Sequence, residues 1–258
     1  MESSAGGSIV LSTLEFDVVW EAERLPPRHP ALDVPSPGST HSERAELAER
    51  AWRALAGRGL ARAGRAGGGL VDQLQLLARP KAGIDVWVWA EREIKGMAVV
   101  SGSQALLCVV DGAEVWLIPV WESSLAESAV SVAGELDPGV GRSVSLPHET
   151  LRAADAQARG DAKALVTALE DRQVALWQAQ ELAGMLLGTV SRGQFGAQRT
   201  ARDGQSRRAG RVVAFHDTDA GRYLFQVQRN TDGRDWATIA PADSGLLAQR
   251  VWELLDET

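Results

Sequence analysis

The amino-acid sequence predicts an α+β fold in which a central antiparallel β-sheet is flanked by two helical bundles. Three observations support this class. Segments with helical periodicity come first in each half of the chain, runs rich in β-branched and aromatic residues follow, and one helix closes each half. The shared order predicts a quasi-twofold repeat, with pseudo-repeats over about residues 43–136 and 147–256. Because the halves would share one sheet and one core, residues 1–258 are treated as a single domain.

The N-terminal elements are predicted to be helices interrupted by a connector. Ser12 and Glu15 form a capping box at the start of a helix over about 13–24. Residues 25–38 contain five prolines, which lack the amide donor and favour an extended segment. Two further helices are predicted over about 42–57 and 70–79.

The first meander begins where the hydrophobic periodicity changes, at Ile84. Ser101-Gly102 and Asp111-Gly112 are signals for hairpin turns between short strands. The predicted strands cover about 84–90, 96–101, 104–110 and 113–120, and a helix follows over 124–132.

The second half repeats this order. Its long helix is predicted over 161–187, with Asp161 as N-cap and Gly188 beyond its end, a length of about 39 Å at 1.5 Å per residue. Such a helix would be the spine of a bundle. The remaining predictions are a helix over 147–158, strands near 194–200, 211–217, 222–229 and 234–240, and a helix over 244–255.

Composition restricts the function classes. The formal net charge of -7 argues against a protein whose whole surface attracts phosphate. The single cysteine, Cys108, lies in an apolar run and is predicted to be a core residue in a reducing compartment. The N-terminus lacks the basic and apolar regions of a secretory signal, and no stretch reaches the ~18 apolar residues of a membrane span. We therefore expect a cytoplasmic protein without membrane insertion.

Motifs for catalysis or cofactor binding are missing from the sequence. There is no GxSxG, no GxxxxGK[ST], no HExxH and no GxGxxG after a strand. The four histidines are scattered without the spacing of zinc ligands. We expect no cofactor, no metal and no enzyme activity.

Two alternatives stay open at this point. A hydrolase could use His216, which precedes Asp217, although neighbouring residues on a strand point to opposite faces. A nucleic-acid-binding regulator could use the arginine loop over 199–211, although no aromatic residue is interleaved for base stacking. The arginines of this loop are Arg199, Arg202, Arg207, Arg208 and Arg211.

Tryptophan is unusually frequent, with nine residues against one tyrosine. In the strand over 84–90, Trp87 and Trp89 alternate with aliphatic residues, so both faces of the strand are apolar. Either helices cover both faces, or one face is kept for a partner, for which tryptophan is well suited.

An ordered set of short motifs resembles the EspG family of secretion-associated proteins of actinobacteria. The motifs span nearly the whole chain. They are PSPG at 35–38, ERA at 43–45, LAGRGL at 55–60, QFGA at 194–197, HDT at 216–218, GRY at 221–223, DGRDW at 232–236 and APAD at 240–243.

The resemblance implies a quasi-twofold fold and a role as a substrate-specific chaperone of type VII (ESX) secretion. Such a protein binds the apolar tip of a PPE-type partner, usually in a PE–PPE heterodimer, keeps it in solution and delivers it to the secretion machinery. It implies neither enzyme nor nucleic-acid activity. The free protein is expected to be a monomer or a weak homodimer.

The resemblance also implies where the partner binds. Contacts are expected from the central sheet, from the C-terminal bundle and from the loop between early strands, here residues 91–96, with Ile94 as an apolar anchor in a charged frame. The expected partner-binding residues are Trp87, Trp89, Arg92, Glu93, Ile94 and Lys95.

Overall fold

The computed structural model describes residues 7–201 and 203–258 and is built around an 11-stranded sheet. The sheet strands are β1 (Ile9–Ser12), β4 (Ala82–Trp89), β5 (Glu93–Ser101), β6 (Gln104–Asp111), β7 (Glu114–Val120), β8 (Val144–Pro147), β9 (Thr189–Thr200), β10 (Ser206–Arg208), β11 (Val213–Thr218), β12 (Gly221–Arg229) and β13 (Asp235–Pro241). Strands β2 (Ala61–Arg62) and β3 (Arg65–Ala66) form a separate hairpin.

The helices are grouped by position along the chain. The N-terminal group comprises α1 (Thr13–Ala22), the short 3-10 helix η1 (Pro30–Leu32), α2 (His41–Gly57) and α3 (Gly68–Ala78). A 3-10 turn, η2 (Glu122–Ser124), and α4 (Leu125–Ser131) follow the first meander. The C-terminal group comprises α5 (His148–Ala158), α6 (Ala162–Glu170) and α7 (Leu176–Leu186), and α8 (Ser244–Asp256) ends the chain.

The strand order confirms two antiparallel meanders joined in one sheet. The order is β1-β7-β6-β5-β4-β9-β11-β12-β13-β8, with β10 paired to β9 outside this path. The junction is the antiparallel ladder between β4 and β9, which runs from Ala82 opposite Arg199 to Trp89 opposite Arg192. Each edge strand, β1 or β8, leads directly into the first helix of a bundle. The internal repeat itself stays a prediction.

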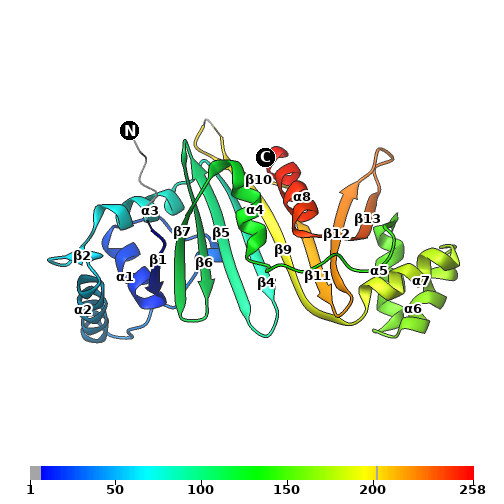
Figure 1. The fold of residues 1–258 in the computed structure, drawn as a ribbon, viewed down its shortest axis with the longest axis horizontal. Coiled ribbons are helices and arrows are strands. Elements are labelled where there is room, and N and C mark those ends of the chain that lie inside the picture. The colour runs from blue at the N-terminus through cyan, green and yellow to red at the C-terminus, as the bar shows by residue number, and fades with distance from the viewer. Residues whose placement is uncertain (1–6, 202) are drawn as a thin grey trace.

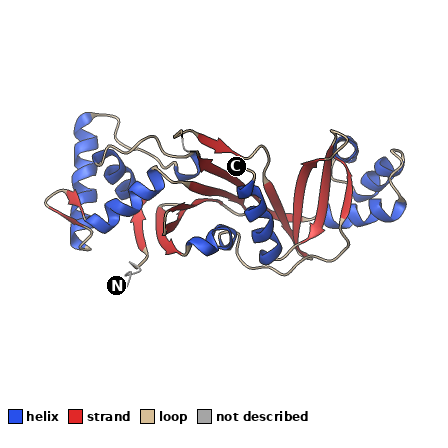
Figure 2. Cartoon of the chain, turned by 90° about the horizontal axis from the view of Figure 1, so that it is seen from above, coloured by secondary structure: helices blue, strands red, loops and turns tan. Residues whose placement is uncertain are grey.

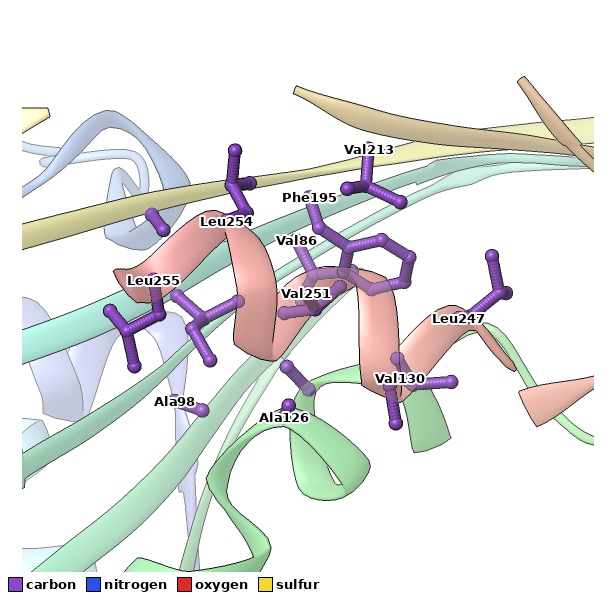
Figure 3. Close-up of a cluster of buried hydrophobic side chains, with 14 of the residues drawn as sticks. Val86, Ala98, Ala126, Val130, Phe195, Val213, Leu247, Val251, Leu254 and Leu255 are labelled. Carbon is purple, nitrogen blue, oxygen red and sulfur yellow. The ribbon is translucent and has the colours of Figure 1, made fainter. Parts of the chain in front are cut away.

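Helices α4 and α8 cover the middle of one sheet face, while the two bundles lie at opposite ends of the molecule (Figures 1 and 2). In Figure 3, Leu247, Val251 and Leu254 of α8 lie against the sheet beside Phe195 of β9. Side chains alternate between the two faces along a strand. Met97 and Val99 of β5 therefore point to the face opposite α4 and α8, where they join the core of the N-terminal bundle. The α4–α8 pair and the two bundles therefore cover different parts of the sheet, on opposite faces.

The predicted helix over 161–187 was wrong, because the chain turns in the middle of it. Helices α6 and α7 are separated by residues 171–175, in which Gln173 adopts a left-handed conformation with φ 64°. The amide of Val174 donates to the carbonyl of Leu169 at 3.1 Å, closing the end of α6. Leu165 and Leu169 of α6 and Ala179 and Ala183 of α7 are buried where these two short helices pack on each other, whereas Leu176 at the start of α7 is exposed.

Short strands were also missed at both edges of the sheet. Strands β1 and β8 have four residues each, which is too short for a clear alternating pattern. Strand β5 begins at Glu93, so the predicted loop over 91–96 is reduced to a tight connection over 90–92. Cys108 is fully buried as predicted, and burial raises the pKa of its thiol.

A buried arginine ties the linker after α4 to the second meander. The guanidinium of Arg222 pairs with Asp217 at 2.7 Å and donates to the carbonyls of Ala133 and Gly134 at 2.7 and 2.8 Å. Its side chain is 1% exposed. The two carbonyl acceptors lie where the chain leaves α4, and Asp217 lies on β11, so this one side chain holds the linker after α4 against the sheet.

Replacing Arg222 with methionine should lower the free energy of unfolding by about 3–5 kcal/mol, because Asp217 would be left buried without its counter-charge. Urea unfolding of Arg222→Met measures this. The control is Arg234→Met, which breaks an exposed pair with Asp232 and should cost less than about 0.5 kcal/mol. Equally small losses of unfolding free energy in both variants would show that Arg222 does not hold the linker after α4 against the sheet.

Candidate binding face of the central sheet

A part of the sheet between the two bundles is left uncovered on the face opposite α4 and α8. Strand pairing places Lys95, Trp87, Gln194, Ala214 and Phe225 in one row across β5, β4, β9, β11 and β12. Each of these side chains is only partly buried. A groove of about 940 Å³ runs over the β9–β12 part of this row. We call the residues Trp87, Trp89, Glu93, Lys95, Arg192, Gln194 and Ala214 the open face.

Two tryptophans of β4 form the aromatic part of the open face. The indoles of Trp87 and Trp89 stack with 6.2 Å between ring centroids and 18° between planes. Their Nε1 atoms donate to carboxylates of neighbouring residues, Trp87 to Asp85 at 3.3 Å and Trp89 to Glu93 at 3.0 Å. Both donors are therefore satisfied inside the protein, and the exposed parts of the two rings offer apolar surface.

A cation lies over each indole. The Lys95 ammonium is 5.6 Å from the Trp87 ring centroid, and the Arg192 guanidinium is 5.8 Å from that of Trp89. The Lys95 ammonium also donates to the carbonyl of Asp33, just after η1, at 3.0 Å. The open face thus combines aromatic surface with positive charge, although the chain as a whole is acidic.

A buried ion pair lies beside Trp87 on the same face of β4. Asp85, 1% exposed, receives two bonds from Arg208 of β10, at 2.5 and 3.0 Å. Gly196 lies under this pair, and a Cβ there would overlap the guanidinium. The glycine therefore allows β10 to fold back and neutralise Asp85, a long-range pairing for which the sequence carries no local signal.

The predicted partner-binding residues do not share one surface. Trp87, Trp89, Glu93 and Lys95 lie on the open face, because Glu93 is opposite Trp89 and Lys95 is opposite Trp87 in the β4–β5 ladder. The other two predicted residues, Arg92 and Ile94, lie elsewhere.

Arg92 lies at the hairpin tip and pairs with Asp111 at 2.5 Å, which holds the pKa of that carboxyl below its usual range. Ile94 is opposite Val88 and packs against the core beneath α4 and α8. The placement of Ile94 in a loop was therefore wrong, since residue 94 belongs to a strand and faces the other side of the sheet, whereas its contact with a partner stays a prediction.

The arginine loop is largely tied to the protein instead of forming one basic surface. Arg208 binds Asp85, Arg211 binds Glu257 at 2.5 Å, and Arg199 donates to the carbonyl of Leu255 at 3.4 Å. Arg207 is exposed and 3.8 Å from Asp203, while Arg202 lies outside the described residues. These contacts argue for a structural role of the loop, with β10 as its returning strand.

His216 does not form a catalytic pair with Asp217. The His216 Nε2 is 2.7 Å from the carbonyl oxygen of Met185, its ring stacks on Tyr223, and burial lowers its pKa. Asp217 binds Arg222 and accepts from the hydroxyl of Ser191 at 2.7 Å. The two side chains serve different contacts, as the alternation along a strand requires.

The described residues also show neither a candidate metal site nor a membrane span. No group of three or more His, Cys, Asp or Glu residues within 7–201 and 203–258 could hold a metal ion. In the same part of the chain no helix combines the length and apolarity that crossing a bilayer demands.

Exposed apolar side chains on the C-terminal bundle and beside it were not predicted as a group. Trp177 of α7 is 51% exposed, and Val140 in the linker between α4 and β8 is 77% exposed. Both line a second hollow beside Tyr223. The prediction of one continuous helix left this exposed group undetected, because it placed Trp177 in the middle of a helix and not in the first turn of α7.

Comparison with known proteins gives a family and a fold. No curated protein matches the chain. A solved structure of the Mycobacterium tuberculosis type VII secretion system chaperone EspG5, in complex with a PE25–PPE41 dimer, superposes with a TM-score of 0.77. The match covers 97% of this chain and 96% of that one at 15% sequence identity, and so shows a common fold. The family model described as the EspG family matches residues 12–253, and the chain therefore belongs to the EspG family.

Proposed function

We propose that the chain is a chaperone of type VII secretion that binds a PPE-type protein, alone or as a PE–PPE heterodimer. The observation that carries this proposal is the open face, a stretch of central sheet with two oriented tryptophans between two bundles. Support comes from membership of the EspG family and from the fold shared with EspG5, which was solved in complex with PE25–PPE41. The protein would act in the cytoplasm, before its client is exported.

The physical task of such a chaperone is to cover an apolar surface reversibly. An exposed apolar tip promotes aggregation until it is covered. The indoles of Trp87 and Trp89 offer rigid apolar faces, and the charges beside them discriminate between clients. This role uses no cofactor and no reactive group, which fits the structural contacts of His216 and Asp217.

The client would lie over the open face, with Glu93 and Arg92 at its rim. Arg92 is already bound to Asp111, so it would shape the rim more than it would bind directly. The exposed Trp177 and Val140 offer a further contact on the C-terminal side. Ile94 would act indirectly, by holding β5 against the core under α4.

Co-expression with each PPE-type protein of the same genome, followed by affinity capture and size-exclusion chromatography, tests the proposed function. We expect one such protein to remain in solution and co-elute with this chain, and to aggregate when this chain is omitted. The proposal fails if every candidate aggregates or elutes separately from the folded chain.

Replacing Trp89 with alanine should weaken the complex by about 2 kcal/mol, because a central aromatic contact would be lost. Isothermal titration calorimetry on the purified partners measures this. The matched control is Trp121→Ala, since Trp121 is 78% exposed just before η2, away from the open face. If both variants bind like the wild type, the open face is not the binding surface.

Replacing Ile94 with aspartate should destabilise the fold by about 2 kcal/mol, because a carboxylate would enter the apolar layer beneath α4. This reverses the expectation for a loop residue, which would leave stability unchanged. Urea unfolding decides between the two. A midpoint equal to that of the wild type would show that residue 94 does not pack in the core.

A further inference from the structure

Arg192 is the cation of the open face for which the described part of the chain supplies no acceptor. Its side chain is exposed and lies over Trp89. Within 7–201 and 203–258, no hydrogen bond or ion pair engages its guanidinium. The nearby basic groups do have acceptors, since Lys95 donates to the backbone carbonyl of Asp33 and Arg208 is neutralised by the carboxylate of Asp85.

The position of this guanidinium over the Trp89 ring prepares it for a carboxylate. A planar guanidinium over an indole keeps its edge free, and that edge carries donors spaced for two parallel bonds to a carboxylate. The ring also limits the orientations of the side chain, so less entropy is lost when a partner binds. Gln194, two residues further along β9 on the same face, adds a side-chain amide that makes no hydrogen bond with side chains or backbone of the described residues.

Glu93 makes the charge distribution around Trp89 asymmetric. Strand pairing places Glu93, Trp89 and Arg192 in one row across β5, β4 and β9, with the acid on one side of the indole and the base on the other. The carboxylate of Glu93 accepts from the Trp89 indole and stays exposed. An incoming carboxylate is attracted on the β9 side and repelled on the β5 side.

We propose that Arg192 is a specificity-determining residue that selects clients with a carboxylate beside the apolar side chain seated on Trp89. Glu93 orients such a client, because the opposite orientation would bring two carboxylates together. This inference rests on the proposed function and adds the chemistry of the client segment to it. The selected partner is a protein segment that combines one apolar and one acidic side chain, oriented across the sheet.

The test uses the PPE-type protein recovered by co-expression and charge reversal on both sides of the interface. Arg192→Glu should weaken the complex by about 30-fold or more, whereas Arg192→Lys should weaken it less, because charge is kept and the two-bond geometry is lost. The control is Arg53→Glu on α2, where the side chain is 72% exposed and 3.9 Å from Glu49. It should bind within about twofold of the wild type, because Arg53 lies on α2 and not on the open face, and salt screens exposed remote charges.

Reversal of client residues then identifies the acidic partner. Each aspartate and glutamate near the apolar tip of the client is changed to arginine, and one such change should restore binding to Arg192→Glu while weakening binding to the wild type. The inference is overturned if Arg192→Glu binds like the wild type, or if no client reversal restores binding. If the wild-type chain forms no complex with any PPE-type protein, the proposed function fails, and the inference fails with it.

Discussion

The antiparallel ladder between β4 and β9 is the interaction on which the rest of the structure depends. It joins two meanders that are separated in sequence by α4, α5, α6 and α7. Because alternate residues of each strand point to opposite faces, the same ladder creates a core and a surface. Val86 and Phe195 turn toward α4 and α8, while Trp87 and Gln194 turn to the uncovered side.

Two arginines neutralise carboxylates that are buried in this sheet. Arg222 neutralises Asp217 and holds the linker after α4, and Arg208 neutralises Asp85 beside Trp87. In each case both carboxylate oxygens accept bonds, which is the condition under which a buried charge is tolerated. Once Asp85 is neutralised, the positive charge of Arg192 dominates the β9 side of the open face.

The open face has the properties of a reversible protein interface. Its apolar area comes from two rigid rings whose polar atoms are already bonded, so binding does not leave a buried donor unpaired. Its charges lie at the edges of those rings, where they favour one orientation of a partner over another. A surface of this kind binds by shape and charge and requires no chemical step, as expected for a chaperone that must release its client.

The sequence by itself determined the fold class, the antiparallel meanders, most helices and the apolar character of both faces of β4, because periodicity and turn signals are local. It also singled out Trp87 and Trp89. Tertiary structure alone decided that Ile94 faces the core and Arg192 the open side, since this follows from where β5 begins and how β9 pairs with β4. The break between α6 and α7 and the pairing of Arg208 with Asp85 were likewise undetermined, because each depends on contacts between residues brought together only by folding.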